Sequence, residues 1–321
     1  MKNFLMRLRA FQKERKTATF YSDRARKNGA HSQKSGKIGI VSERGLWYTE
    51  AAKEKGGWGM LLAIDIGNSN VSLGVFQGET LRVRAKLSAQ TERSADEYAT
   101  VIYDLLRMNG LSREDLTGCI LSSVVPELTG LVEAAVGRLT KAAVLRVGPG
   151  VRTGFRIRID DPSQLGGDLV ADTLAALTEY GAPLIILDAG TVTTLAVVDE
   201  SRTYLGGCIL PGIRASASLL KSTTALLPSI TLGVGEEDCL GRNSADAMRC
   251  GLLLGSALMV DGFIDRFRAL PGMAGAKVVA TGGSAKLATA YCSREVTLDE
   301  DLTLKGLRYL YESNQPRTRK F

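Results

Sequence analysis

The sequence predicts an α/β protein made of two duplicated, related lobes. Three observations support this prediction: a strand–turn–strand segment occurs twice, strands alternate with amphipathic helical segments, and the composition is that of a globular protein. The chain has 321 residues, of which 45% are hydrophobic and 23% charged. A chain of this length accommodates one large or two ordinary domains with a sizeable core.

The repeated segment first appears at residues 61–76, where two apolar runs flank the turn Asp65-Ile66-Gly67-Asn68. It returns at residues 184–198, with Asp188-Ala189-Gly190-Thr191 as its turn. The two aspartates are 123 positions apart. Each copy reads as a buried strand, a tight polar turn and a return strand, which indicates an internal duplication.

The remaining elements alternate between strands and helices. The capping box Ser94-Ala95-Asp96-Glu97 predicts a helix that runs to about Asn109. Further strands are expected at 118–124, 142–147, 203–209 and 278–281, and further helices at 169–180, 213–226, 244–267 and 302–311. The first lobe is expected to span 60–180 and the second 181–312, with a disordered tail at 313–321.

Residues 1–59 are set apart by their charge. They hold 14 of the 41 Lys and Arg but 5 of the 34 Asp and Glu, which leaves 27 basic and 29 acidic residues for the body. We expect a basic, poorly ordered extension, with a nucleic-acid-binding tail as the alternative. Codons for Lys55-Gly56-Gly57 can form a ribosome-binding sequence, so we also hypothesise that translation starts at Met60.

Composition excludes several kinds of chemistry from the body. His31 is the only histidine, so a Ser-His-Asp triad and histidine-ligated metals are excluded after residue 59. Five cysteines without a C-x-x-C pair favour lone thiols in a reducing compartment. No run of about 18 consecutive apolar residues occurs. We therefore expect a cytoplasmic protein, and a body with a net charge of −2 predicts no nucleic-acid partner and no membrane contact.

The two turns have a specific physical use. Glycine lets backbone N–H groups approach an anion, hydroxyl and amide side chains donate to phosphate oxygens, and an aspartate holds a cation directly or through water. One such turn alone is also typical of an ordinary hairpin, but two at matching positions favour phosphate binding. No G-x-x-x-x-G-K-[ST] loop occurs, and Gly148 to Gly154 is better interpreted as a connecting turn.

The block from Met60 to Asn314 resembles the type III pantothenate kinases, bacterial members of the actin, hexokinase and Hsp70 ATPase superfamily. The resemblance rests on motifs that agree in order and spacing: Asp65-Ile66-Gly67-Asn68-Ser69-Asn70, Ser122-Ser123-Val124-Val125-Pro126, Val147-Gly148-Pro149-Gly150, Gly166-Gly167-Asp168, Asp188-Ala189-Gly190-Thr191, Gly206-Gly207-Cys208-Ile209-Leu210-Pro211-Gly212, Gly241-Arg242-Asn243-Ser244 and Thr281-Gly282-Gly283.

This resemblance implies an actin/hexokinase-like fold, with two ribonuclease-H-like lobes around a nucleotide cleft, and ATP-dependent phosphorylation of pantothenate in a homodimer. It implies ATP, Mg²⁺ and K⁺ or NH₄⁺ as cofactors, Asp188 as the metal ligand and Asp168 as the general base. The implied nucleotide contacts are Asp65, Ile66, Gly67, Asn68, Ser69, Asn70, Val71, Ser72, Gly190, Thr191, Gly282 and Gly283. The implied pantothenate contacts are Ile159, Gly166, Gly167, Asp168, Leu169 and Ser244.

Chemistry read from the residues supports a carboxylate base, because phosphoryl transfer needs an acceptor for the hydroxyl proton and the body of the chain after residue 59 has no histidine. Asp168 also suits a helix N-cap, and the two roles are compatible.

The acceptor side departs from the family pattern at two positions. The family has Arg where this chain has Leu169, and commonly Tyr where it has Ile159; Ser244 stands for a Thr and keeps the hydroxyl. Pantothenate is an anion, so the loss of an Arg removes a strong carboxylate partner. Two interpretations stay open: a working kinase with a rearranged pocket, using Arg158 or Arg242, or a nucleotide-binding paralogue with another acceptor or none.

Overall fold

The structure, a computed structural model, describes residues 59–235 and 240–315, which belong to one structural unit. The predicted N-terminal extension therefore lies outside the described residues except for Gly59, as do Cys239 and positions 316–321 of the predicted tail.

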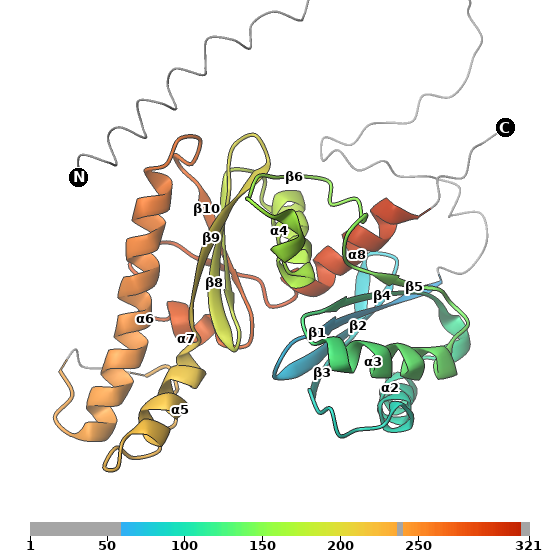
Figure 1. Ribbon diagram of the computed structural model, residues 1–321, viewed down its shortest axis with the longest axis horizontal. Helices are drawn as coiled ribbons and strands as arrows, with labels where there is room; N and C mark the ends of the chain where they lie inside the picture. Colours follow the sequence, from blue (N-terminus) through green and yellow to red (C-terminus); the bar gives the residue numbers. More distant parts are fainter. Residues whose placement is uncertain (1–58, 236–239, 316–321) are drawn as a thin grey trace, which may run out of the picture. The chain divides into compact units, whose positions relative to one another are not determined.

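The first sheet has five strands and carries the first copy of the repeated segment (Figure 1). In spatial order they are β3 (Thr80–Ser88), β2 (Asn70–Gln77), β1 (Met60–Ile66), β4 (Leu116–Ser123) and β5 (Val144–Arg146). The hairpin strands β1, β2 and β3 pair antiparallel, whereas β4 pairs parallel with β1 and β5 parallel with β4.

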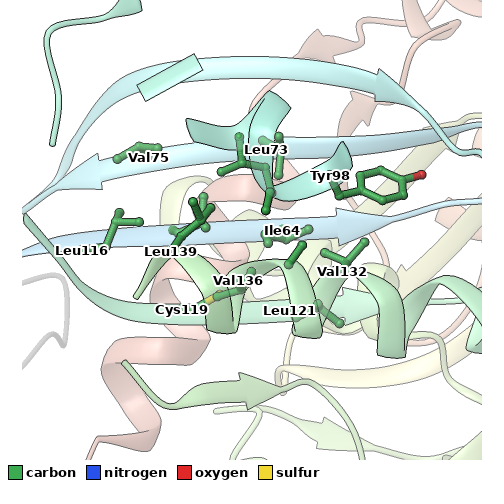
Figure 2. Packing of buried hydrophobic residues seen from close by; sticks show 14 of the residues in the cluster. Ile64, Leu73, Val75, Tyr98, Leu116, Cys119, Leu121, Val132, Val136 and Leu139 are labelled. Carbon is green, nitrogen blue, oxygen red and sulfur yellow. The ribbon is translucent and has the colours of Figure 1, made fainter. Parts of the chain in front are cut away.

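One face of this sheet is covered by two helices, α2 (Ala95–Met108) and α3 (Pro126–Leu139). The Ser94 hydroxyl caps α2 by accepting from the Glu97 N–H, and the Glu97 carboxylate accepts from the Ser94 N–H, so the predicted capping box is present. Figure 2 shows Ile64 of the sheet among side chains from both helices, including Tyr98 and Val132. A short 3₁₀ turn, η3 (Arg113–Asp115), leads into β4.

The second sheet has six strands. In spatial order they are β11 (Thr297–Leu298), β10 (Lys277–Thr281), β7 (Leu184–Ala189), β8 (Val192–Val198), β9 (Thr203–Pro211) and β6 (Arg156–Ile157). The hairpin strands β7, β8 and β9 pair antiparallel, and β10 pairs parallel with β7.

The two sheets share one topology. The order β9-β8-β7-β10 in the second sheet repeats β3-β2-β1-β4 in the first, with the same antiparallel and parallel pairings. This agreement matches the duplication read from the sequence. One strand departs from the predicted lobe boundary at residue 180. Strand β6 precedes this boundary in the chain, but it pairs with β9 of the second sheet.

Two helices, α4 (Gly167–Glu179) and α8 (Leu302–Asn314), form a layer between the sheets. Their apolar side chains share one core with Leu61 and Ala63 of β1 and with Leu184 and Ile186 of β7. The helices cross closely at Gly306, where a Cβ would lie 1.9 Å from the Ala171 carbonyl oxygen. This crossing sets where the N-terminal turn of α4 lies between the two sheets.

The far face of the second sheet packs against α6 (Ser244–Arg268) and α7 (Ala285–Thr289), and α5 (Ile213–Thr223) lies beside α6 (Figure 1). A last 3₁₀ turn, η4 (Pro162–Gln164), precedes α4. Most predicted elements appear within a few residues of their expected bounds. The largest differences are at two helix ends: α5 ends at Thr223 rather than at 226, and α8 continues to Asn314, inside the predicted tail.

Candidate active site

A row of polar side chains crosses the first sheet at the carboxyl end of β1. Asp65 pairs with Ser72 of β2 and with Ser122 of β4, and Ser72 pairs with Lys86 of β3. Paired residues on neighbouring strands project from the same face of a sheet. The face that buries Leu61 and Ala63 in the shared core therefore ends in the row Lys86, Ser72, Asp65, Ser122.

The second sheet carries the equivalent row. Asp188 pairs with Thr194 of β8 and with Thr281 of β10. A hydroxyl residue thus flanks the aspartate on both sides in each sheet. The two rows differ at the position that Lys86 occupies in the first sheet. Ser72 pairs there with Lys86, whereas Thr194 pairs with Ile209.

The two repeated turns meet each other. The Gly67 N–H donates to the Asn70 carbonyl at 2.9 Å, and the Gly190 N–H donates to the Val192 carbonyl at 2.9 Å, so both turns close in the same way. The hydroxyls of Ser69 and Thr191 form a hydrogen bond of 2.7 Å across the 122 residues that separate them. The predicted phosphate loops therefore lie in contact.

Close backbone packing surrounds the Asp188 turn. Gly282 has φ of 95°, and a Cβ there would lie 2.5 Å from Asp188 Oδ1. A Cβ at Gly212 would lie 2.4 Å from the Thr191 carbonyl oxygen. Only glycine lets these segments approach the turn.

Helix α4 brings two more carboxylates to the same place. Asp168 and Asp172 are four residues apart and so lie on one face of the helix. The helix begins after Gly166, so Asp168 lies in its first turn rather than at the predicted N-cap position. A Cβ at Gly167 would lie 2.9 Å from Ser122 Oγ, which shows how closely the start of α4 approaches the polar row.

The four aspartates act on one another electrostatically. Burial, followed by the charges of Asp168 and Asp188, raises the pKa of Asp65 to about 7. Burial, followed by the charge of Asp168, raises the pKa of Asp188 to about 7. Burial also raises the pKa of Asp168, although the Leu169 N–H donates to its Oδ1 at 2.7 Å. The Lys86 ammonium opposes the shift at both Asp65 and Asp188.

Asp172 is the most enclosed of the four. It is fully buried, and neither of its carboxylate oxygens has a hydrogen-bond partner. Burial first, and then the charge of Asp188, raises its pKa well above the ordinary value, although the nearby Thr303 hydroxyl acts in the opposite direction. The buried Ser122 hydroxyl likewise lacks a partner with hydrogen-bonding geometry, although it lies near Asp65 and lowers the pKa of that carboxyl.

A cavity of about 320 Å³ lies beside these groups. It is lined by β3 on one side and by the Gly282-Gly283 turn and the start of α7 on the other. Basic side chains dominate its charged lining: Arg84, Lys86 and Lys286, with Glu300 as the acidic one. A basic cavity next to two glycines suits the phosphates of a nucleotide.

The residues fit a cation that is bound together with phosphate. Among the described residues no three acidic or sulfur side chains lie close enough to hold a metal by themselves. Asp65 and Asp188 instead offer single carboxylates next to hydroxyl groups. Mg²⁺ is commonly held in this way, by one or two carboxylates plus substrate phosphates and water.

The predicted acceptor residues separate into two groups. Gly166, Gly167, Asp168 and Leu169 open α4 beside the polar row, and Ile159 packs on the shared core near Gly206. Ser244 opens α6 instead, and no hydrogen bond of the described residues joins it to the four aspartates. Arg158 lines a separate cavity with Arg156 and Asp199, while Ile157 and Ile159 pack on the shared core.

Two of the predicted nucleotide contacts point away from the cleft. The Ile66 and Val71 side chains are buried in the core of the first lobe, so these residues can reach a ligand only through their backbone. Asn68, Ser69 and Asn70 are exposed at the turn.

Four groups near the site have no place among the predicted site residues. Lys86, Ser122 and Asp172 lie in the polar row or beside it, and Tyr204 of β9 lies near Asp168, whose charge adds to burial in raising the tyrosine's pKa. The register of the duplicated hairpins could have placed Lys86, since it fixes which residue of β3 extends the row.

Comparison with known proteins agrees with this geometry. Residues 61–266 match the family model described as type III pantothenate kinase. The chain belongs to this family. A type III pantothenate kinase from Rubrobacter xylanophilus is 41% identical over 81% of this chain and all of its own length. One from Brevibacillus brevis is 40% identical over 80% of this chain and all of its own length.

Solved structures show the fold. A protein from Sinorhizobium meliloti described as a 2-dehydro-3-deoxygalactonokinase aligns with a TM-score of 0.50 and 13% identity, over 81% of this chain and 99% of its own. A Campylobacter jejuni protein described as a Baf family transcriptional activator aligns with a TM-score of 0.50 and 20% identity, over 79% and 98% of the two chains. The predicted two-lobed actin/hexokinase-like fold is confirmed.

Proposed function

We propose that this type III pantothenate kinase transfers the γ-phosphate of ATP to the hydroxyl of pantothenate. The product, 4'-phosphopantothenate, is formed in the first step of coenzyme A biosynthesis. Family membership supports this reaction. The observation that carries it is the meeting of Asp168 with the two Asp-x-Gly turns beside a basic cavity.

ATP binds across the two turns in this proposal. Residues 65–72 and the backbone of Gly190 and Thr191 receive the phosphates, and Gly282-Gly283 borders the rest of the nucleotide. The contact between Ser69 and Thr191 supports a shared phosphate site, because both hydroxyls point at the same small volume. Neighbouring backbone N–H groups in such turns bind anions without needing a lysine-containing loop.

A divalent metal and a monovalent cation complete the ATP side. Mg²⁺, when bound, neutralises phosphate charge, and Asp65 is placed to hold it directly or through water. Asp188 is the proposed ligand of K⁺ or NH₄⁺. The raised pKa values of both carboxyls support these roles, since a bound cation would favour their ionised forms.

Asp168 is the proposed general base. Its raised pKa suits a group that must accept a proton near neutral pH. The pantothenate oxygen forms a bond to the γ-phosphorus while the bond from that phosphorus to the ADP oxygen breaks. The hydroxyl proton moves to the Asp168 carboxylate, and Gly166-Gly167 lets the acceptor come close to the backbone.

The side chains of the acceptor pocket determine whether pantothenate or another compound is the substrate. Leu169 and Ile159 make this side apolar where the family carries Arg and commonly Tyr. Arg158 lines a separate cavity, whereas Ile159 packs on the shared core. Tyr204 of the second sheet is buried near Asp168, and the charge of Asp168 adds to burial in raising the pKa of the tyrosine. These changes favour, as the second candidate, a nucleotide-binding paralogue with a different acceptor.

A homodimer is proposed from the exposed apolar face of α5 and α6. Gly251, Gly255, Leu258 and Gly262 lie along one side of α6, and Leu258 is 72% exposed. Nothing lies within 4 Å of a Cβ at any of these three glycines. A second copy of the chain could therefore pack closely against this side, and Leu219 of α5 extends the apolar area.

A cytoplasmic location is proposed as well. Among the described helices α6 alone has the length and apolar composition that would allow a membrane span. Its Asp261 accepts from the backbone N–H groups of Ser293 and Arg294, and its Asp265 pairs with the Arg294 side chain. These contacts tie α6 into the second lobe, and the pantothenate kinase relatives are biosynthetic enzymes.

A coupled assay of ADP release by the full chain tests the function, with ATP, Mg²⁺ and K⁺ and with or without pantothenate. Pantothenate-dependent release is expected. If Leu169 only weakens the pocket, Leu169→Arg should lower the KM for pantothenate. ATP binding without pantothenate-dependent release would favour the paralogue.

A further inference from the structure

Lys86 stands out in the polar row because it is the cation of a cluster that is otherwise acidic. The row Lys86, Ser72, Asp65, Ser122 is fixed by the hairpin register. The charge of Lys86 acts on both Asp65 and Asp188, so its ammonium lies near the aspartates of both repeated turns. No ion pair formed by Lys86 occurs among the described residues, unlike its neighbour Arg84, which pairs with Glu300 and Asp301.

The Lys86 ammonium group lies close to residues of both lobes. Lys86 belongs to β3 of the first sheet, yet a Cβ at Gly283 of the second lobe would lie 3.8 Å from Lys86 Nζ. The side chain also lines the cavity next to Gly282 and Gly283. Lys86 therefore lies at the basic cavity, close to the Gly282-Gly283 turn of the second lobe.

A cation at this position would offset the repulsion between the aspartates and the phosphates of ATP. Four aspartates surround the meeting point of the loops, and ATP adds several negative charges of its own. Like charges about 4 Å apart repel by several kcal/mol at the effective dielectric of a protein surface. A phosphate that approaches Asp168 therefore needs a cation on its other side.

We propose that Lys86 binds the terminal phosphate of ATP and holds it in position for transfer to the acceptor hydroxyl, whose proton goes to Asp168. This inference rests on the proposed kinase function and adds a phosphate-binding residue from β3 to the two turns. A lysine ammonium is a compact charge that can follow a phosphate group on its flexible stem. Ser72, the neighbour of Lys86 in the row, would donate from the same face.

The test compares ADP with AMPPNP, a nonhydrolysable ATP analogue, by calorimetry on the full chain with Mg²⁺. Lys86→Met should weaken AMPPNP binding by about 10-fold or more and leave ADP binding within about twofold, because only AMPPNP has the third phosphate. Lys86→Arg should restore part of the loss, since it keeps the charge. Turnover should fall by about 100-fold in Lys86→Met.

Arg82→Met is the matched control, because Arg82 also lies on β3 but bonds Gln77 and is not among the described residues that line the cavity. It should leave the ratio of the two dissociation constants as in the wild type. If Lys86→Met leaves the ratio of the ADP and AMPPNP dissociation constants unchanged, whether or not both bind more weakly, the proposal is overturned. Lys86 would then serve only as a counter-ion of the aspartates. The comparison needs no acceptor, so it remains decisive even if pantothenate is not the substrate.

Discussion

The carboxyl group of Asp172 lies inside the shared core with both oxygens unpartnered. An ionised carboxylate in such a place is costly, and the usual outcome is that the group keeps its proton. Asp172 therefore differs from Asp168 on the next turn of the same helix, which is half-buried and hydrogen-bonded. Burial thus raises the pKa of Asp172 more strongly than that of Asp168 on the same helix face.

This difference has a pH signature. The pKa of Asp172 is raised, and the pKa values of Asp65 and Asp188 rise from 3.8 to about 7. The folded protein therefore keeps protons that the unfolded chain releases above pH 4. The free energy of unfolding should fall as pH rises from about 4 to 7, by about 1.4 kcal/mol per pH unit for each such group at most.

Asp172→Asn should weaken this pH dependence and raise the melting temperature most at pH 8. Thermal unfolding of the full chain without nucleotide or Mg²⁺, between pH 5 and pH 8, measures the effect. A mutant that differs from the wild type by the same amount at both pH values would show that Asp172 has an ordinary pKa.

Asp168→Asn tests the base itself. The amide cannot accept the hydroxyl proton, so turnover should fall by about 10²- to 10⁴-fold. The change preserves size and leaves the two turns in place, so ADP affinity should remain within about twofold of the wild type. Steady-state kinetics and calorimetry measure the two quantities, and unchanged turnover would assign the base to another group.

At the scale of elements, the close crossing of α4 and α8 fixes the position of the helix that carries Asp168. Gly306→Ala would force a Cβ against the Ala171 backbone. The helices must then separate, which should lower stability by about 1–3 kcal/mol or more and reduce turnover by displacing Asp168. Denaturant unfolding and the ADP-release assay measure both effects.

Gly130→Ala is the control for that change, since Gly130 lies on the exposed side of α3 with nothing within 4 Å of a Cβ. It should raise stability by about 0.5–1 kcal/mol through helix propensity. If both alanine variants behave alike, the crossing at Gly306 does not constrain the helices.

The elements also show what the sequence could predict. The repeated strand–turn–strand segments and the capping box of α2 follow local patterns, so they could be expected from hydrophobic spacing and motifs. Lys86 and Asp172 belong to no motif. Lys86 reaches the site through the register of β3, and Asp172 through the packing of α4 against α8, and both depend on contacts between distant segments.

Helix boundaries illustrate a second limit. The helix that carries Asp168 begins at Gly167, two residues before the expected start, because Gly166 serves as its N-cap. Glycine has weak helix propensity, so the pattern favoured a start after it. Tertiary packing of the Gly167 backbone against Ser122 and Val147 overrides that preference.

For the whole molecule, the proposed dimer makes the clearest prediction. Leu258→Glu places a charge in the centre of the exposed apolar side of α6, so it should convert dimers to monomers. Light scattering during size-exclusion chromatography measures the mass. Leu226→Glu is the control, because Leu226 is 94% exposed and lies beyond the end of α5. A wild-type chain that runs as a monomer would contradict the proposed dimer.

The duplication leaves the two loops nearly equivalent, and a symmetric pair of loops has no intrinsic direction. A phosphate chain does have one, from its nucleoside end to its free end. The two polar rows differ at one position, where Lys86 in the first sheet corresponds to Ile209, 71% exposed, in the second. If Lys86 binds the terminal phosphate as proposed, this difference in charge between the two rows gives an elongated anion one favoured orientation instead of two.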